Sequence, residues 1–365
     1  MDKTRTASFV RRWIPLAIVL LAFAFLGGGA GATAQTGPSI SQVVVLGDSF
    51  SDNGNLFSRT GGPPPPYWQG RISNGPVGVE YLAQKLGVPL NDRAWAGATT
   101  GVGNAVDGGT VDSLGAWGLP GMTTAFQGLV ADPVDPNALY ILWGGGIDLT
   151  AAFAAPAEAS VIIGKAVANL VTMAVTLQSL GATRVLVLNL QDFAKVPGFL
   201  QADPQIRAFI TQGCLALNQA LKINLPLGAH YFDTFSLFTG IIADPGEYGL
   251  SNVTDQLIAA PGADPNGYFF WDGNHFSTAG HAIMAKALFR SVAPTVIVGE
   301  SDSGVPNTLL SSGSTISDLI MQAAFQAKNH GEFVSAVASI TNGLVRDRVI
   351  TGNQKGVLES LAARQ

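Results

Sequence analysis

Residues 43–55 read Val43-Val44-Val45-Leu46-Gly47-Asp48-Ser49-Phe50-Ser51-Asp52-Asn53-Gly54-Asn55. The first four residues form a continuous apolar, mostly β-branched run, which is typical of a strand buried on both faces of a parallel sheet. A glycine, an aspartate and a serine follow this run directly. Because ligands bind at the carboxyl ends of the strands in such sheets, we expect the residues just after Leu46 to face a functional site.

The chain beyond this stretch alternates strand-like and helix-like segments. Three more short apolar runs read as strands, at Leu139–Trp143, Arg184–Leu188 and Tyr231–Asp233. Longer stretches between and after them read as helices, at Val77–Leu86, Ala157–Leu180 and Gln205–Ile223, with a last helix from Ser277-Thr278 to about Ser291. This alternation predicts an α/β domain over residues 41–294, with helices covering both faces of a parallel sheet in three layers.

The composition changes after Pro294. Residues 295–315 are rich in Gly, Ser and Pro and are predicted to be a linker. Beyond it, Phe333, Val337, Ile340 and Leu344 recur at helical spacing, so residues 316–365 are predicted to form a small bundle of two or three helices. Fifty residues are marginal for an independent core, and both a docked and a hanging appendage fit the sequence.

The N-terminus has the features of an export signal. Four basic residues precede an apolar run from Ile14 to Leu26, and Ala32-Thr33-Ala34 follows. We expect residues 1–34 to be a signal peptide cleaved after Ala34, because the apolar run is short for a bilayer span. The alternative is an uncleaved membrane anchor. The protein is then exported by a bacterium, to the periplasm or the medium.

Composition excludes several classes of protein. Of the 365 residues 47% are hydrophobic and 12% charged, and the formal net charge is −5. Residues 1–34 hold four basic side chains and one acidic side chain, so the processed chain carries −8. This is not the basic footprint of a nucleic-acid-binding protein. Cys214 is the single cysteine, which rules out an intramolecular disulfide and favours a buried thiol; no ligand spacing suggests a metal or another cofactor.

Only four histidines are available as catalytic bases: His230, His275, His281 and His330. His275 stands out because it ends the turn Trp271-Asp272-Gly273-Asn274-His275. An aspartate three residues before a histidine on one loop can hold the imidazole through one nitrogen and leave the other free as a general base. His281 falls inside a predicted helix and reads as a packing or surface residue.

Ser49 is a candidate nucleophile to pair with His275. A serine at a strand end, flanked by glycine, can present its hydroxyl to a carbonyl carbon and its N–H to the developing oxyanion. The competing interpretation is that Asp48 and Ser49 only cap the following helix.

Several short blocks, in the right order over about residues 41–294, resemble GDSL esterases and lipases of the SGNH hydrolase superfamily. Gly47–Asn55 resembles the opening block, and Gly70–Pro76 is similar to the loop before the first helix. Ala94–Ala98 resembles the second block and Asp272–His275 the last one. Tyr248–Asn252 is similar to the phospholipase- and thermolabile-haemolysin-like branch.

The resemblance implies a fold and a site. The fold is a flavodoxin-like α/β/α domain with a parallel sheet of about five strands, followed here by the small helical appendage. The implied catalytic triad is Ser49, Asp272 and His275, and the backbone N–H groups of Ser49 and Gly97 are the implied oxyanion donors. One block departs from the family pattern Gly-x-Asn-Asp, because Ile147 stands where the asparagine would donate to the oxyanion. Losing one such donor typically costs about 10²–10³ in turnover.

The leading hypothesis is hydrolysis of a carboxylic ester, without a cofactor. The expected partner is a small-molecule or lipid ester, and transient contact with a membrane or glycan surface stays open, as does the oligomeric state. Acyl transfer to an alcohol uses the same intermediate. A second hypothesis is a hydrolase scaffold that has lost turnover and serves in binding at the cell surface, motivated by Ile147. A solute-binding protein would fit export but explains neither the serine block nor the Asp-x-x-His turn.

Overall fold

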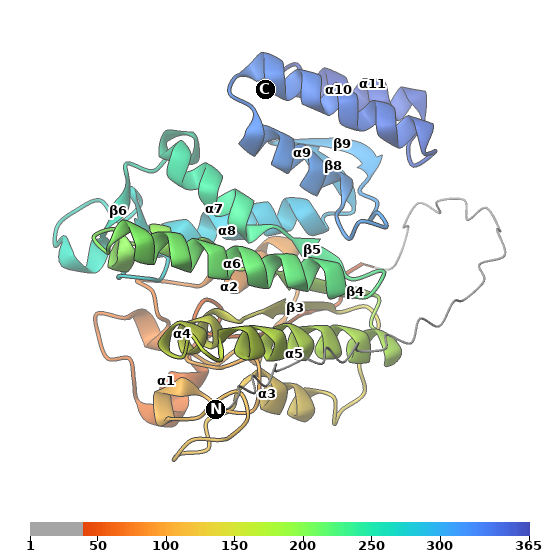
Figure 1. Cartoon of the computed structure of the whole chain (residues 1–365). Helices are drawn as coiled ribbons and strands as arrows, with labels where there is room; N and C mark the ends of the chain where they lie inside the picture. Colours follow the sequence, from red (N-terminus) through yellow and green to blue (C-terminus); the bar gives the residue numbers. More distant parts are fainter. Residues whose placement is uncertain (1–38) are drawn as a thin grey trace, which may run out of the picture. The chain divides into compact units, whose positions relative to one another are not determined.

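The computed structural model describes residues 39–365, and the expected signal peptide lies outside the described residues. The centre is a five-stranded parallel sheet with the strand order β2-β1-β3-β4-β5 (Figure 1). The strands are β1 (Val43–Gly47), β2 (Leu90–Asp92), β3 (Leu139–Trp143), β4 (Arg184–Leu188) and β5 (His230–Phe232). The predicted α/β class and the parallel sheet of about five strands are therefore confirmed.

Helices cover both faces of this sheet. The connection from β1 to β2 runs in the opposite direction along the sheet to the three later connections, so right-handed crossovers place its helix on the opposite face. That helix, α2 (Gly78–Leu86), packs against α8 (Thr278–Val292). The other face carries α3 (Met122–Leu129), α5 (Ala159–Ser179) and α6 (Pro204–Asn224). The remaining helices of the domain are α1 (Asn55–Thr60), α4 (Gly146–Ala154) and α7 (Thr234–Ala243).

Burial explains why the central strands read as unbroken apolar runs. Every residue of β1 and β3 is buried, because helices cover both sides. Cys214 on α6 is fully buried, as its lone occurrence suggested, and burial raises the pKa of its thiol to about 12. Ser277 caps the amino end of α8, since its hydroxyl accepts a hydrogen bond from the Gly280 N–H at 3.1 Å.

By length and composition α5 could cross a membrane. In the structure its inner face is buried in the core through Ala166, Leu170 and Leu177, and the helix packs against β4, α4 and α6. An apolar helix that covers a parallel sheet needs such a face, so its hydropathy is accounted for by the domain core.

The segment expected to be a linker contains regular structure. Residues 295–306 form an antiparallel hairpin of β8 (Thr295–Val298) and β9 (Ser301–Pro306). Val296, Val298 and Val305 of this hairpin are buried in a second hydrophobic cluster. The cluster is shared with α9 (Ile316–Gln326), α10 (His330–Arg346) and α11 (Gly352–Ala362), the blue elements in Figure 1. Most of the expected linker is thus part of the C-terminal unit.

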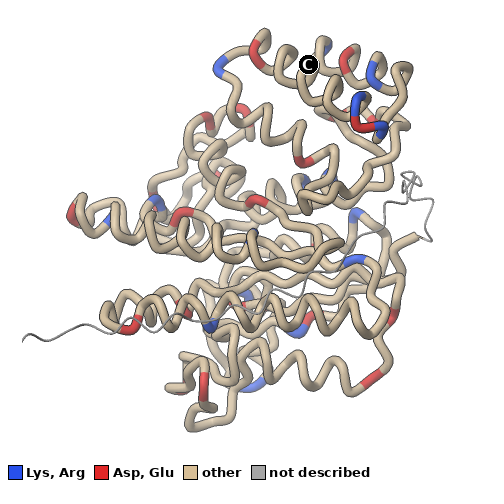
Figure 2. The backbone as a smooth tube through the Cα atoms, turned by 45° about the vertical axis from the view of Figure 1, so that its right-hand side comes forward, with Lys and Arg blue, Asp and Glu red and all other residues tan. Residues whose placement is uncertain are grey.

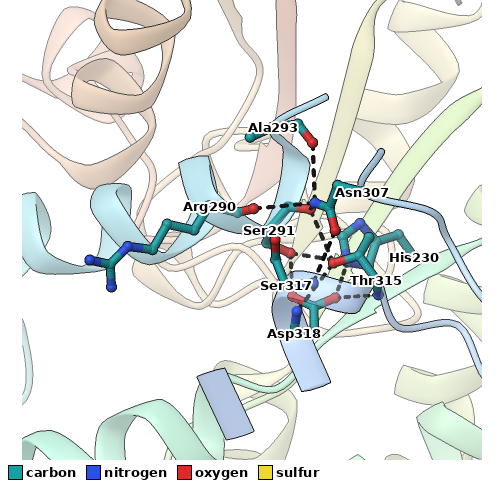
Figure 3. A network of polar contacts seen from close by, with 8 residues as sticks. All are labelled: His230, Arg290, Ser291, Ala293, Asn307, Thr315, Ser317 and Asp318. Atoms are coloured by element: carbon teal, nitrogen blue, oxygen red, sulfur yellow. Dashed lines mark hydrogen bonds and ion pairs between the residues drawn. The ribbon is translucent and has the colours of Figure 1, made fainter. Parts of the chain in front are cut away.

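The C-terminal unit docks on the hydrolase-like domain through α9, which packs against α7 and α8. A largely buried polar network, which we call the Asp318 network, joins the two parts (Figure 3). The Asp318 carboxylate contacts Nε2 of His230 at 2.6 Å and accepts the Ser291 hydroxyl at 2.6 Å and the Thr315 N–H at 2.7 Å. His230 belongs to β5 and Ser291 to α8, so one carboxylate ties three elements together.

Candidate active site

The Ser49 side chain is set by a tight turn at the carboxyl end of β1. The N–H groups of Ser51 and Asp52 both donate to the Asp48 carbonyl, at 3.1 and 3.0 Å. The Phe50 N–H donates to Oδ1 of Asp48 at 3.1 Å. Ser49 thereby sits at the start of a helical turn that directly follows the strand, with 8% of its surface exposed.

Asp272 and His275 come from a turn after β7 (Tyr268–Phe270), which pairs with β6 (Asn252–Gln256) beside the main sheet. Oδ1 of Asp272 accepts the N–H groups of Asn274 and His275, at 2.9 and 2.8 Å. The same carboxylate contacts Nδ1 of His275 at 2.9 and 3.0 Å. The positions of Asp272 and His275 therefore depend on local sequence, because the Asp272 side chain accepts the backbone N–H groups of the turn that presents the histidine.

The serine turn and the Asp272–His275 turn meet at the edge of the sheet where the parallel strands end. Nε2 of His275 lies 2.9 Å from Oγ of Ser49, 226 residues away in the sequence. The structure therefore brings together the three side chains that the sequence singled out. Hydroxyl, imidazole and carboxylate stand in the order that lets the histidine accept the serine proton while the carboxylate holds its other nitrogen.

Tyr67 extends this arrangement by one more hydrogen bond. Its hydroxyl donates to Oδ2 of Asp272 at 3.1 Å. Burial and the nearby Asp272 charge raise the pKa of Tyr67 to about 12, so the hydroxyl stays a donor at neutral pH. Burial alone would raise the pKa of Asp272, but the hydrogen bond and charge of His275, with the two backbone N–H groups, lower it overall. The carboxylate thus stays ionised, as the orienting role requires.

Aromatic side chains pack against one side of the His275 imidazole. The Phe50 ring lies 5.3 Å from the His275 ring, 5.0 Å from Phe276 and 5.3 Å from Trp143, measured between centroids. The side chains of Phe50, Phe276 and Trp143 are all buried. These buried, close-packed rings fix the orientation of the imidazole and exclude water from that side.

Gly97 lies on a loop that is fastened to the serine turn. The Trp95 N–H donates to the Gly47 carbonyl at 3.1 Å, and the Ala96 N–H donates to Oδ2 of Asp52 at 2.7 Å. Gly97 itself has φ +83°, and a Cβ there would lie 2.5 Å from Oδ1 of Asn104. Both the backbone conformation and the close approach require glycine at this position.

Ile147 occupies the first turn of α4, directly after the glycines that end β3. Gly145, with φ +110°, turns the chain into the helix, and a Cβ on Gly146 would lie 3.8 Å from Oδ2 of Asp48. The amino end of α4 therefore lies beside the serine turn. The N–H groups of a first helical turn have no acceptor within the helix, so they are free to serve a ligand there.

Asp148, the last residue of the same block, makes a structural contact. Its carboxylate accepts the Thr100 N–H and hydroxyl, both at 2.9 Å. Burial raises its pKa, and the two Thr100 hydrogen bonds oppose that rise. This contact ties α4 to the loop that carries Gly97.

Sequence reasoning missed Tyr67, and it did not assign tasks to Asp52 and Asp148. Tyr67 follows the proline run in an irregular loop, and no periodicity or spacing connects it with Asp272. For metals, residues 39–365 place no group of three or more His, Cys, Asp or Glu side chains so as to hold an ion.

Comparison with known proteins finds relatives of similar sequence. A phosphatidylcholine-sterol acyltransferase from Aeromonas hydrophila is 30% identical over 230 residues, covering 60% of this chain and 66% of the relative. A thermolabile hemolysin from Vibrio parahaemolyticus is 27% identical over 293 residues, covering 69% of this chain and 64% of the relative. The chain thus spans slightly less than two thirds of each relative's length.

Solved structures of esterases also align with this chain. An acetylxylan esterase from Geobacillus stearothermophilus aligns with a TM-score of 0.38 and 16% identity, over 69% of this chain and 94% of its own. An aryl esterase from M. smegmatis aligns with a TM-score of 0.37 and 18% identity, over 68% and 96%.

The family model described as GDSL-like Lipase/Acylhydrolase matches residues 43–288, a span that runs from β1 to α8 and includes Ser49, Gly97, Asp272 and His275. This span is most of the α/β domain. The chain belongs to the GDSL-like lipase/acylhydrolase family.

Proposed function

We propose that this protein is an exported serine hydrolase that cleaves carboxylic esters through an acyl-enzyme on Ser49. The observation that carries the proposal is the chain of contacts from Ser49 Oγ to His275 Nε2, and from His275 Nδ1 to Asp272. Family membership supports an acyl-ester-acting enzyme. The assignment of individual catalytic roles rests on the geometry and is ours.

In the first half of the reaction, His275 takes the Ser49 proton as Oγ attacks the ester carbonyl carbon. Asp272 stabilises the imidazolium that results. The oxyanion is held by the N–H groups of Ser49 and Gly97, and by the first-turn N–H groups of α4 in place of the missing asparagine side chain. His275 then gives its proton to the leaving alcohol, and the C–O bond of the ester breaks.

In the second half, His275 takes a proton from water, and the hydroxide attacks the acyl-enzyme carbonyl. The second tetrahedral intermediate collapses, Ser49 regains its proton from His275, and the carboxylic acid leaves. An alcohol in place of water would give a new ester. This acyl-transfer reaction is the second candidate, because one relative is named as an acyltransferase.

Turnover of chromogenic acyl esters of two to sixteen carbons tests the mechanism. We expect Ser49→Ala and His275→Ala to abolish turnover, and Ser51→Ala, a matched change two residues away at a fully buried serine, to retain it. Turnover that survives in Ser49→Ala would refute the serine mechanism. Serine-dependent turnover on none of the esters would favour the binding-scaffold hypothesis.

Adding a primary alcohol and separating new ester from free acid distinguishes transfer from hydrolysis. Transfer is the main reaction only if new ester exceeds acid at alcohol concentrations far below that of water. The chain-length profile of the hydrolysis separates short-chain esterase from lipase activity.

Export is proposed from residues 1–34 alone. The mass and N-terminal sequence of protein recovered outside the cytoplasm test this. Processing after Ala34 gives a chain that begins at Gln35, and a retained Met1 would overturn the cleavage.

A further inference from the structure

Four Phe and Trp side chains in residues 39–365 are more than a third exposed: Phe57, Trp117, Phe199 and Phe209. Each belongs to a segment that begins where a strand of the parallel sheet ends. Phe57 lies on α1 after β1, Trp117 on the connection after β2, and the other two on the connection after β4. Because parallel strands all end at one edge, these segments all start from the edge that holds Ser49.

The connection between β2 and β3 presents the most exposed of these side chains. Trp117 is 58% exposed, and Leu114 and Val106 on the same connection are 50% and 47% exposed. Val106 is also next to the candidate oxyanion loop, since a Cβ on Gly97 would lie 2.6 Å from its Cγ2. The apolar side chains therefore begin at the oxyanion side of the site.

This connection is held rigidly in its exposed position. The Asp107 carboxylate accepts the N–H groups of Trp117 and Leu119, at 2.9 and 3.0 Å. The Asp107 carbonyl also accepts the Ala116 N–H at 3.0 Å. Asn104 is fully buried and binds the Ala96 carbonyl through its side chain at 2.9 Å. These bonds fix a loop whose apolar side chains would otherwise be free to fold inward.

Exposed aromatic rings also lie near the Asp272–His275 turn and near the loop that carries Tyr67. The Gly198 N–H donates to the Gly273 carbonyl at 2.7 Å, inside the Asp272–His275 turn, and the next residue is the half-exposed Phe199. Phe57 packs against Gly70, at the end of the short 3-10 helix that follows Tyr67. We call Phe57, Val106, Leu114, Trp117 and Phe199 the apolar rim.

Charge decides which surface this rim fits. Figure 2 shows Lys and Arg positions interspersed with Asp and Glu positions along the described backbone. On the rim connection, Asp107 is engaged by backbone N–H groups and Asp112 pairs with Lys165 at 2.6 Å. The processed chain is also acidic. Attraction to a surface must then come from apolar burial, for which Trp and Leu at a lipid–water interface are well suited.

We propose that the apolar rim docks the protein on the surface of a zwitterionic phospholipid bilayer, with the Ser49 site facing the lipid. Trp117 and Leu114 enter the interface beside the oxyanion loop, and Phe57 and Phe199 complete the contact. The purpose of this docking rests on the proposed ester hydrolysis, but the docking itself does not require turnover.

Vesicle partition is the direct test. The purified exported protein with Ser49→Ala, which cannot consume the lipid, is mixed with phosphatidylcholine vesicles, and bound protein is separated by sedimentation. We expect Leu114→Ser/Trp117→Ser in this background to lower the partition coefficient at least about tenfold, since interfacial binding scales with buried apolar area. The matched control is Ile223→Ser/Leu227→Ser. These two side chains are 71% and 78% exposed, more than Leu114 and Trp117, and they lie at the other edge of the sheet. We expect this control to shift the partition coefficient less than about twofold.

The same pairs of substitutions in the Ser49 protein report on folding. Both variants should hydrolyse a soluble acetyl ester within about twofold of the parent, because neither pair touches the triad. A rim variant that binds vesicles like the parent overturns the proposal, as does an equal loss in the control. Absence of binding by the parent, or binding that requires phosphatidylglycerol and disappears with salt, also overturns it.

Two further outcomes can be distinguished from lipid docking coupled to ester hydrolysis. Sedimentation velocity that shows a dimer dissolved by the rim substitutions would assign the rim to a second copy of the chain and refute lipid docking. If the Ser49→Ala protein binds vesicles but the Ser49 protein hydrolyses no ester, the proposed function fails and the docking stands.

Discussion

The hydroxyl of Tyr67 and the carboxylate of Asp272 are joined by a hydrogen bond of 3.1 Å across 205 residues of sequence. Tyr67 thus gives Oδ2 of Asp272 a second partner, since Nδ1 of His275 lies 3.0 Å from the same oxygen. Hydrogen bonds to charged groups are worth about 1.5–3 kcal/mol. In the proposed mechanism Tyr67 is a positioning residue, since it acts on Ser49 and His275 through Asp272.

We expect Tyr67→Phe to lower kcat about fivefold to tenfold while KM stays unchanged, because only the orientation of the catalytic base is loosened. Steady-state kinetics on a soluble ester measure both constants. Tyr81→Phe is the matched control, since it removes a tyrosine hydroxyl that bonds Thr278 at 2.7 Å, away from the triad. Equal losses in the two variants would mean that Tyr67 contributes only to packing.

The second prediction concerns the missing oxyanion donor. Ile147→Asn restores a side-chain donor at the first turn of α4, and we expect kcat to rise at least about tenfold. Ile147→Leu, which keeps the volume and adds no donor, should leave kcat unchanged. A fall in kcat for the asparagine variant alone would show that the α4 backbone already fills the oxyanion position.

The third prediction uses the acidity of Asp48. Burial raises its pKa from 3.8 to about 6, although the Phe50 N–H and the His275 charge act in the opposite direction. A raised folded-state pKa stabilises the fold fully below about pH 4, and this contribution is lost as the pH rises through about 6. Asp48→Asn stays neutral throughout, so the variant should gain in free energy of unfolding relative to the parent between pH 4 and 7.

Urea unfolding at pH 4, 5, 6 and 7 measures this difference. At one pKa unit per 1.36 kcal/mol its upper bound is about 3 kcal/mol. Asp52 also has a raised pKa, but both proteins contain it, so it cancels in the comparison. The Asp148 charge contributes to the raised pKa of Asp48, so the measured difference includes this coupling. A difference that does not vary with pH would contradict the assignment to Asp48.

The fourth prediction concerns the Asp318 network (Figure 3). Asp318→Ala leaves His230, Ser291 and the Thr315 N–H without their shared acceptor, and we expect a loss of about 3 kcal/mol in the free energy of unfolding. Asp347→Ala, whose carboxylate is 59% exposed in an ion pair with Arg346, should change it little.

Ester turnover separates a stability effect from a catalytic one. Since no member of the Asp318 network contacts the triad in the described structure, the folded Asp318→Ala protein should keep its kcat at low temperature. Loss of kcat in protein that is still folded would show coupling between the C-terminal unit and the active site.

Much of the fold follows from local sequence, and the exceptions have physical reasons. The strands predicted at Leu139–Trp143 and Arg184–Leu188 are confirmed, because buried central strands read as continuous apolar runs. The strand β2 was missed, since it is a three-residue edge strand with two polar, half-buried residues. The hairpin β8–β9 was hidden by its Gly and Ser content, although its valines are buried in the C-terminal cluster.

The site shows a similar division. Ser49, Asp272 and His275 could be found because each lies in a short block with its own signal, and the Asp272–His275 contact is local. Tyr67 could not be found, since its role depends only on how distant loops meet. The task of Asp52 is of the same kind, because its bond to the Ala96 N–H appears only once the serine turn and the Gly97 loop are side by side.

The 2.9 Å contact between Ser49 and His275 also has a consequence for biosynthesis. The serine is made early and the histidine late, so a chain still on the ribosome has no complete hydrolytic site until the last helix of the domain has emerged. Closing so long a loop is also an expensive step in folding. If the proposed function holds, truncated or half-folded products should therefore be inert toward esters, and heat should abolish turnover and the folded structure together.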